Sequence, residues 1–278
     1  MSHVTNIELN NGVQIPQVGY GVFQIPNDQT QSAVEGALEA GYRHIDTAAA
    51  YQNEAGVGAG VRASGIARDE LFITTKLRNG EQGHEATLKA FDNSRRELGV
   101  DVIDLFLIHW PAPSQDLYLQ TWKAMEKLYA DGAVRAIGIS NFLPDHVARL
   151  VQHAEVTPAV NQIELHPSYQ QPNTQSASRD AGIAVEAYAP LGQAQDLDST
   201  AVTAAAEALD VTTGQVVLRW HIQNGTIVIP KSVTPERVRS NIDVFSFELS
   251  DEQMSAITDL DTDTRMFPDP QTADFTMM

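Results

Sequence analysis

An acid and a phenol stand close together between Gly41 and Tyr51, and both can take part in proton transfer. Residues 43–47 are expected to form a short strand that ends near Asp46, and Tyr51 follows five positions later. Thr47 and three alanines separate the two side chains, which leaves room for a ligand to approach both. An acid and a phenol at the end of a strand are candidates for general acid–base chemistry rather than for packing.

Two further side chains, Lys76 and His109, are expected at the ends of other strands. A free phenol titrates near ~10, and a lysine ammonium beside it lowers its pKa. Asp46 would hold Lys76 and offset the cost of its burial, and His109 would donate a hydrogen bond to a substrate oxygen. This set suits reduction of a carbonyl, in which hydride reaches carbon and Tyr51 protonates the oxygen. Because side chains supply no hydride, a bound donor is required.

Each of the four residues also has a purely structural explanation. Asp46 could cap a helix or form a buried ion pair, and Lys76 could lie at the rim. His109 could be a hydrogen-bonded core histidine, and Tyr51 could be a surface aromatic. Ion-pair networks without function shift pKa values too. The coincidence of all four at strand ends favours the catalytic interpretation.

A basic cluster points to the hydride donor. Lys231 ends a strand, and Arg237 and Arg239 follow in the next helix, in a chain whose net charge is −18. A helix N-terminus with lysine and arginine is an anion site, although a solvated basic helix face is the alternative.

Polar and aromatic side chains at other strand ends fit the rest of such a donor. Ser140, Asn141 and Gln162 could hydrogen-bond a carboxamide, and Tyr188 could stack on a flat ring.

Alternating strand and helix signals position these groups. Two short strands around Asn10-Asn11-Gly12 predict a hairpin. The later strands are apolar without alternation, as two-sided burial in a parallel sheet requires. Eight strands are expected at 18–23, 44–47, 71–76, 102–109, 134–140, 159–163, 183–188 and 226–230, and helices at 29–40, 53–64, 85–98, 116–130, 144–153, 174–181, 200–209, 213–223, 235–242 and 250–260.

Eight βα units in about 250 residues predict a (β/α)₈ TIM barrel, whose active site lies at the C-terminal ends of the strands. We expect one domain over residues 1–278, with a polar loop after residue 261. A doubly wound sheet is the alternative, and it requires a phosphate fingerprint after the first strand. The run Gly56-Val57-Gly58-Ala59-Gly60 resembles that fingerprint, but no strand precedes it, so a closely packed helix is the better interpretation.

The composition excludes several classes of protein. The acid excess argues against nucleic acid and anionic membranes as partners. The sequence has no cysteine, which excludes disulfides and thiol catalysis. No apolar run approaches the ~18 residues of a spanning helix, and no signal-peptide pattern begins the chain. These observations predict a cytoplasmic protein.

Several motifs in order resemble the aldo-keto reductases, and most closely the bacterial branch with the 2,5-diketo-D-gluconic acid reductases. The resemblance runs from residue 4 to residue 260. It implies a (β/α)₈ barrel, with the hairpin capping its bottom, that reduces carbonyls with NADPH. The motifs are residues 41–51 with Glu54 and Gly58, 74–77, 107–111, 138–142, 161–167, 189–192 and 229–233 with Arg237 and Asn241.

The resemblance also assigns roles residue by residue. The catalytic tetrad falls on Asp46, Tyr51, Lys76 and His109. The nicotinamide contacts fall on Ser140, Asn141, Gln162 and Tyr188, and the pyrophosphate loop on Leu191, Gly192 and Gln193. The adenosine 2′-phosphate site falls on Lys231, Ser232, Val233 and Arg237, with Asn241 near the adenine.

Substrate contacts are predicted at the mouth of the barrel. Phe23 and Trp110 are expected to be apolar walls beside His109. Relatives often carry tryptophan where this chain has Arg78, which could attract a carboxylate-bearing substrate. Ser240 replaces a glutamate that is common beside the adenine. The tail after residue 261 departs most from the family, in which this loop shapes substrate choice.

Two other functions remain as alternatives. A metal-dependent hydrolase on the same barrel would take its ligands from His44, Asp46, His109, Glu164 and His166. A non-catalytic NADPH-binding module would use the barrel as a partner surface. The preferred prediction is an NADPH-dependent carbonyl reductase without a metal, acting as a monomer on small-molecule substrates.

Overall fold

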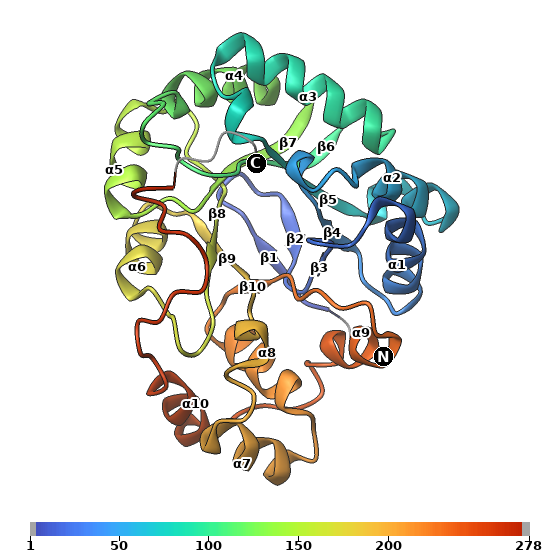
Figure 1. Ribbon diagram of the computed structural model, residues 1–278, viewed down its shortest axis with the longest axis vertical. Coiled ribbons are helices and arrows are strands. Elements are labelled where there is room, and N and C mark those ends of the chain that lie inside the picture. The colour runs from blue at the N-terminus through green and yellow to red at the C-terminus, as the bar shows by residue number, and fades with distance from the viewer. Residues whose placement is uncertain (1–3, 274–278) are drawn as a thin grey trace.

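Eight parallel strands form a barrel in the computed structural model, which describes residues 4–273 (Figure 1). Neighbours in the sheet follow the order of the chain, so all the strands turn their C-terminal ends to the same mouth. The strands are β3 (Tyr20–Gly21), β4 (His44–Asp46), β5 (Phe72–Leu77), β6 (Ile103–Ile108), β7 (Val134–Ser140), β8 (Val160–Glu164), β9 (Ala184–Tyr188) and β10 (Ile227–Val228).

A seam of hydrogen bonds between the first and last of these strands closes the barrel. Val18 forms a parallel bridge with Val228. The N–H of Gly19 donates to the Val228 carbonyl at 2.8 Å, and the N–H of Val228 donates to the Gln17 carbonyl at 2.9 Å. A doubly wound sheet is open, so this seam excludes it and confirms the (β/α)₈ barrel.

Two strands are shorter than predicted by three residues or more, and both lie at the seam. β10 ends at Val228 rather than at residue 230, because Pro230 has no N–H to extend the ladder. β3 is confined to residues 20–21 because the extended chain around it forms hydrogen bonds alternately with the strands on its two sides, β10 and β4. Gly19 donates to Val228, whereas Val22 donates to the Asp46 carbonyl.

Helices surround the barrel (Figure 1), and each begins and ends within two residues of its predicted bounds. Across residues 4–273, none combines the length and the hydrophobicity that crossing a bilayer requires. The helices are α1 (Asn27–Glu39), α2 (Glu54–Ala63), α3 (His84–Leu98), α4 (Tyr118–Ala130), α5 (Pro144–His153), α6 (Pro172–Asp180), α7 (Thr200–Leu209), α8 (Thr213–Gln223), α9 (Pro235–Ile242) and α10 (Asp251–Thr258).

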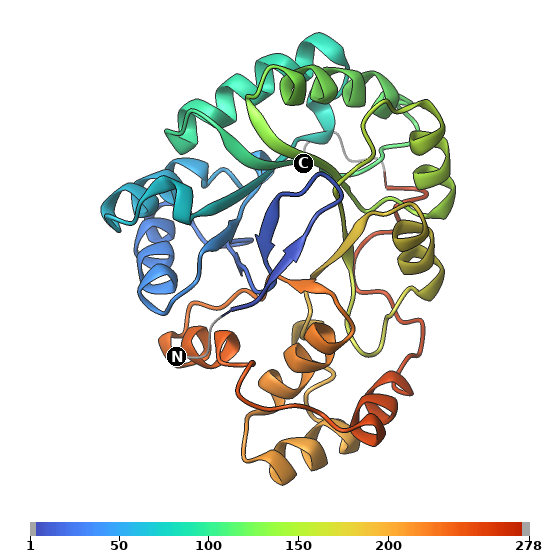
Figure 2. The same cartoon turned by 180° about the vertical axis from the view of Figure 1, so that it is seen from behind.

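The N-terminal hairpin closes the bottom of the barrel, as predicted. Its strands β1 (Asn6–Glu8) and β2 (Gln14–Pro16) lie across the barrel end that faces the viewer in Figure 2. Leu9 and Ile15 are buried in a cluster with side chains of the barrel strands, including Leu107. The Asn10 amide fixes the hairpin by donating to the Pro158 carbonyl at 2.8 Å. Ligands therefore reach the interior from the opposite, C-terminal end.

The glycine-rich run belongs to α2, a closely packed helix, as predicted. A Cβ on Gly60 would lie 2.8 Å from the Cβ of Val34 in α1, and one on Gly58 would collide with the Leu98 carbonyl. These glycines therefore allow helices to approach one another and do not form a phosphate loop.

The segment after residue 261 contains no helix or strand as far as residue 273. It returns from α10 towards β8 and β9 (Figure 1). The rest of the predicted loop lies outside the described residues.

Candidate active site

A pocket of about 370 Å³ opens at the C-terminal ends of the strands. Four non-glycine residues in its wall, Gln24, Asn141, Ala189 and Gln193, have φ between 48° and 64°. Such strained backbone clusters at functional sites. Predicted site residues that line the pocket are Phe23, Asp46, Tyr51, His109, Trp110, Ser140, Asn141, Gln162, Tyr188, Leu191, Gln193 and Lys231.

A buried ion pair lies behind the pocket. The Lys76 ammonium donates to Asp46 Oδ1 at 2.6 Å and to the Thr47 carbonyl at 2.9 Å. Burial alone lowers the pKa of Lys76, but the acidic groups around it, with the Asp46 carboxylate first, outweigh that effect, and the net pKa is raised. Lys76 is therefore a fixed positive charge, and Asp46 is its counter-charge.

Tyr51 lies between this charge and the pocket. The Lys76 Nζ is 5.2 Å from the centre of the Tyr51 ring, and the rings of Phe23 and His109 pack against it at 5.0 and 5.7 Å. Burial raises the pKa of Tyr51, and Lys76 opposes that rise. The phenol thus keeps its proton at neutral pH, while the nearby ammonium favours the phenolate that would follow proton donation.

His109 is a neutral imidazole at the pocket wall. Burial, with a smaller contribution from Lys76, lowers the pKa of His109 well below its ordinary value. Its Nδ1 is buried without a hydrogen-bond partner among residues 4–273. A neutral imidazole carries one N–H, so His109 can donate a single hydrogen bond to a ligand oxygen.

The Gln162 side chain has one group left for a ligand. Its Nε2 donates to Asp46 Oδ2 at 2.8 Å and to Glu186 Oε2 at 2.9 Å. A primary amide has two N–H donors, and two carboxyl oxygens occupy both. The remaining Oε1 is therefore an acceptor, which suits the NH₂ of a carboxamide.

Glu186 is a buried neighbour of the candidate site that was not among the predicted residues. It lies in β9, is fully buried, and belongs to the same cluster as Asp46 and Lys76. Burial, followed by the charge of Asp46, raises the pKa of Glu186 to about 8. One signal was available, since Glu186 is the one acid in an otherwise apolar strand.

Replacing Glu186 with glutamine should remove a pH dependence of stability. Because the folded pKa of about 8 exceeds the ordinary value of 4.5, the folded protein holds a proton that the unfolded chain releases. The resulting stability is present below the unfolded pKa and is lost as the pH rises through the folded pKa. Glu186→Gln should therefore gain stability relative to wild type between about pH 5 and 8, by at most ~1.4 kcal/mol per unit.

Urea unfolding of both proteins across this range would measure the difference. A difference that does not change with pH would contradict a protonated Glu186.

Hydrogen bonds pre-arrange the side chains on the other side of the pocket. Tyr188 Oη donates to Asn141 Oδ1 at 2.8 Å, and Asn141 Nδ2 donates to the His109 carbonyl at 3.0 Å. Ser140 Oγ donates to the Gln162 carbonyl at 2.9 Å. The tyrosine ring and the amide are thus held in place before any ligand binds.

Two exposed cations, Lys231 and Arg237, lie before and in the first turn of α9, where a phosphate could bind. Within residues 4–273, the side chains of Lys231 and Arg237 form no ion pair or hydrogen bond. Arg239, by contrast, pairs with Glu236 of its own helix at 3.3 Å. Unpaired cations at a helix N-terminus match the 2′-phosphate of NADPH, and the Gln162 acceptor matches its carboxamide.

Some predicted site residues do not line the pocket. Lys76 is buried behind it, and Arg78 follows β5 outside the described lining, so its attraction of carboxylates stays a prediction. Of the remaining cofactor residues, Gly192 and Ser232 adjoin lining residues, Val233 follows Ser232, and Arg237 and Asn241 lie on α9.

Phe267 lines the pocket but was not among the predicted site residues. It lies in the C-terminal segment, and its ring meets that of Tyr188 edge-on at 5.2 Å. A bulky aromatic residue in a mostly polar tail was the available signal.

The metal-hydrolase alternative finds no support. No three His, Asp or Glu side chains within residues 4–273 are grouped so that they could hold a metal ion. His44 bonds to Thr74 Oγ1 at 3.0 Å inside the barrel, whereas Glu164 and His166 bond to each other at 3.1 Å.

The sequence profile of the Aldo/keto reductase family matches residues 17–262. The chain belongs to this family. An aldo-keto reductase of Mycolicibacterium smegmatis is 51% identical over 270 residues, which cover 97% of this chain and 98% of that protein. The glyoxal reductase of Bacillus subtilis is 47% identical over 265 residues, which cover 95% of each chain.

A solved structure extends the likeness to three dimensions. A mutant of the protein Gox0644, determined in complex with NADPH, is 45% identical and superimposes with a TM-score of 0.95, covering 99% of this reductase and all of that chain. The expected fold, reaction class and cofactor are therefore confirmed: this aldo-keto reductase is an NADP(H)-dependent oxidoreductase. The narrower likeness to 2,5-diketo-D-gluconic acid reductases stays a prediction.

Proposed function

We propose that this reductase converts small aldehydes and ketones to alcohols with Tyr51 as the proton donor. The observation that carries the proposal is the position of the Tyr51 phenol at the pocket wall, with Lys76 Nζ 5.2 Å from the centre of its ring. An acid next to a stabilising cation is what a carbonyl oxygen requires as it gains negative charge.

NADPH, when bound, supplies the hydride. His109 donates a hydrogen bond to the carbonyl oxygen and positions it against Tyr51. Tyr51 transfers its proton to that oxygen, and the Lys76 ammonium stabilises the phenolate that remains. Asp46 keeps Lys76 charged and in place through the 2.6 Å ion pair. Phe23 and Trp110 exclude water from the pocket.

The cofactor would lie along the wall from β7 to α9. Gln162 accepts from the carboxamide, Ser140 and Asn141 complete its polar surroundings, and Tyr188 offers its ring to the nicotinamide. The pyrophosphate would contact the loop Leu191, Gly192 and Gln193. The adenosine 2′-phosphate would lie between Lys231, Ser232, Val233 and Arg237, with Asn241 by the adenine.

Replacing Arg237 with glutamine should weaken NADPH binding about tenfold or more and leave NADH binding nearly unchanged, because NADH lacks the 2′-phosphate. Quenching of protein fluorescence by each cofactor would give the two dissociation constants. Arg239→Gln is the matched control, since Arg239 lies in the same helix but is already paired with Glu236. Equal weakening for both cofactors would contradict a phosphate contact at Arg237.

Small dicarbonyls and keto-sugar acids are the substrate classes to examine first. The glyoxal reductase of B. subtilis is 47% identical, and the pocket of about 370 Å³ suits a small molecule. Oxidation of NADPH should be followed at about 340 nm, where the reduced nicotinamide absorbs, with aldehydes, ketones, dicarbonyls and keto-sugars as substrates. Failure to reduce any of them, with NADPH bound, would refute the proposal.

We further propose that residues 1–278 act as one domain and as a monomer in the cytoplasm. Within residues 4–273, Val233 is the only large hydrophobic side chain that is exposed, which offers little surface for a stable interface. The chain also contains no cysteine that would require an oxidising compartment. Light scattering after size-exclusion chromatography would reveal a dimer if this is wrong.

A further inference from the structure

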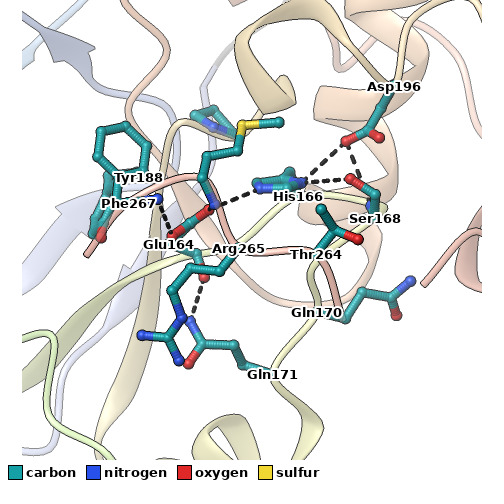
Figure 3. A network of polar contacts seen from close by, with 12 residues as sticks. Glu164, His166, Ser168, Gln170, Gln171, Tyr188, Asp196, Thr264, Arg265 and Phe267 are labelled. Atoms are coloured by element: carbon teal, nitrogen blue, oxygen red, sulfur yellow. Dashed lines mark hydrogen bonds and ion pairs between the residues drawn. The ribbon is translucent and has the colours of Figure 1, made fainter. Parts of the chain in front are cut away.

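One carboxylate fixes the part of the C-terminal segment that reaches the pocket. Residues 261–273 have no helix or strand, yet they deliver Phe267 to the pocket wall. The N–H groups of Met266 and Phe267 donate to Glu164 Oε1 at 2.7 Å and Oε2 at 3.2 Å. Glu164 is the last residue of β8, so the barrel itself supplies the anchor (Figure 3).

The same carboxylate begins a chain of charges. Glu164 Oε1 accepts from His166 Nε2 at 3.1 Å, and Asp196 Oδ2 accepts from His166 Nδ1 at 3.1 Å (Figure 3). All three side chains are buried. Burial alone lowers the pKa of His166, but its bonds to Asp196 and Glu164 outweigh it, and the net pKa is raised. Each ring nitrogen of His166 faces a carboxylate oxygen, an arrangement that favours the imidazolium and links the two carboxylates.

Asp196 connects this chain of charges to the loop assigned above to the cofactor. It follows the turn Gly192–Ala194, and a side chain on Gly192 would collide with it. The Ser168 N–H also donates to Asp196 Oδ2 at 3.4 Å. The Ser168 carbonyl in turn accepts from the N–H of Thr262 at 3.1 Å. The cofactor loop and the C-terminal segment are therefore both connected to the buried Asp196, the latter through Ser168.

We propose that Glu164, His166 and Asp196 form a carboxylate–histidine clamp that joins the C-terminal segment to the cofactor loop. Glu164 is a positioning residue, because it places Phe267 in the pocket and so limits the size of the carbonyl substrate. The role in substrate choice rests on the function proposed above. The mechanical link between the loops does not.

The clamp has a distinctive consequence for remote loops. Removing one carboxylate leaves the buried His166 without one of its two partners, which is energetically unfavourable. Because the groups form one network, the change also weakens the hold of Glu164 on the C-terminal segment. Loss of Asp196 should therefore loosen residues 262–267, although Asp196 itself bonds to none of them within residues 4–273. A ligand that orders the cofactor loop should tighten the same residues.

Hydrogen–deuterium exchange on the cofactor-free full chain tests the link. In Glu164→Gln and in Asp196→Asn, amides of residues 262–267 should exchange at least about tenfold faster than in wild type. Glu126→Gln is the matched control, since buried Glu126 also accepts from two successive N–H groups, those of Glu155 and Val156, far from the pocket. Its exchange at 262–267 should not change.

Unchanged exchange at 262–267 in Asp196→Asn would overturn the clamp, and this variant carries the test if Glu164→Gln does not fold. The exchange assay needs no turnover, so its result is independent of the proposed reaction. For the positioning role, the kcat/KM ratio between glyoxal and a bulky aromatic ketone should fall about tenfold in Glu164→Gln. The same ratio as in wild type would overturn that role.

Discussion

Replacing Tyr51 with phenylalanine should lower kcat/KM for carbonyl reduction by about 10²–10⁴-fold, because the reaction loses its proton donor. The ring remains, so its packing against Phe23 and His109 should persist. NADPH binding should stay within about twofold, because the assigned cofactor contacts lie on other residues. The change should appear in kcat rather than in the dissociation constant of the cofactor.

Steady-state kinetics and fluorescence titration with NADPH would separate these two quantities. Tyr129→Phe is a suitable control, since Tyr129 lies on α4 and its hydroxyl accepts from Asn11 of the bottom hairpin. Turnover by Tyr51→Phe close to that of wild type would overturn the assignment of the proton donor.

Replacing Asp46 with asparagine should cost about 3–5 kcal/mol of folding stability, because it leaves the Lys76 ammonium buried without its counter-charge. Both side chains are almost completely buried and lie 2.6 Å apart. The double variant Asp46→Asn/Lys76→Met removes both charges and should recover most of that loss. Its activity should nevertheless stay low, since Tyr51 then lacks the cation that stabilises its phenolate.

Stability and activity should thus separate in this pair of variants. Urea unfolding gives the free energies, and turnover with an aldehyde gives the activity. If Asp46→Asn were as stable as wild type, the two groups would not form a charged pair in the folded protein. If the double variant regained activity, Lys76 would have no role beyond packing.

The sequence could predict that the four tetrad candidates meet, because a parallel barrel brings all its strand ends to one mouth. Asp46, Lys76 and His109 each stand at or just after a strand end, so their meeting follows from topology alone. The expected support of Lys76 by Asp46 agrees with the observed ion pair. The catalytic roles themselves stay predictions until the variants are measured.

Other features depend on contacts that topology alone does not specify. Glu186 lies inside the barrel and reaches Asp46 only through the amide of Gln162. Phe267 enters the pocket from a segment without helix or strand, so no periodicity could place it. Glu164 was considered only as a metal ligand, although it binds backbone N–H groups about a hundred residues away in the chain.

The seam of the barrel has a consequence for the time at which the protein can fold. Gln17 donates to the Ile222 carbonyl across 205 residues of chain, and the Val18–Val228 bridge lies beside it. During synthesis, β3 can pair with β4 on one side, but its other edge has no partner until β10 has left the ribosome. Contacts of such high sequence separation close late and slowly. Nearly the whole polypeptide must therefore be made before the barrel can shut, and its unpaired edges are open to association until then.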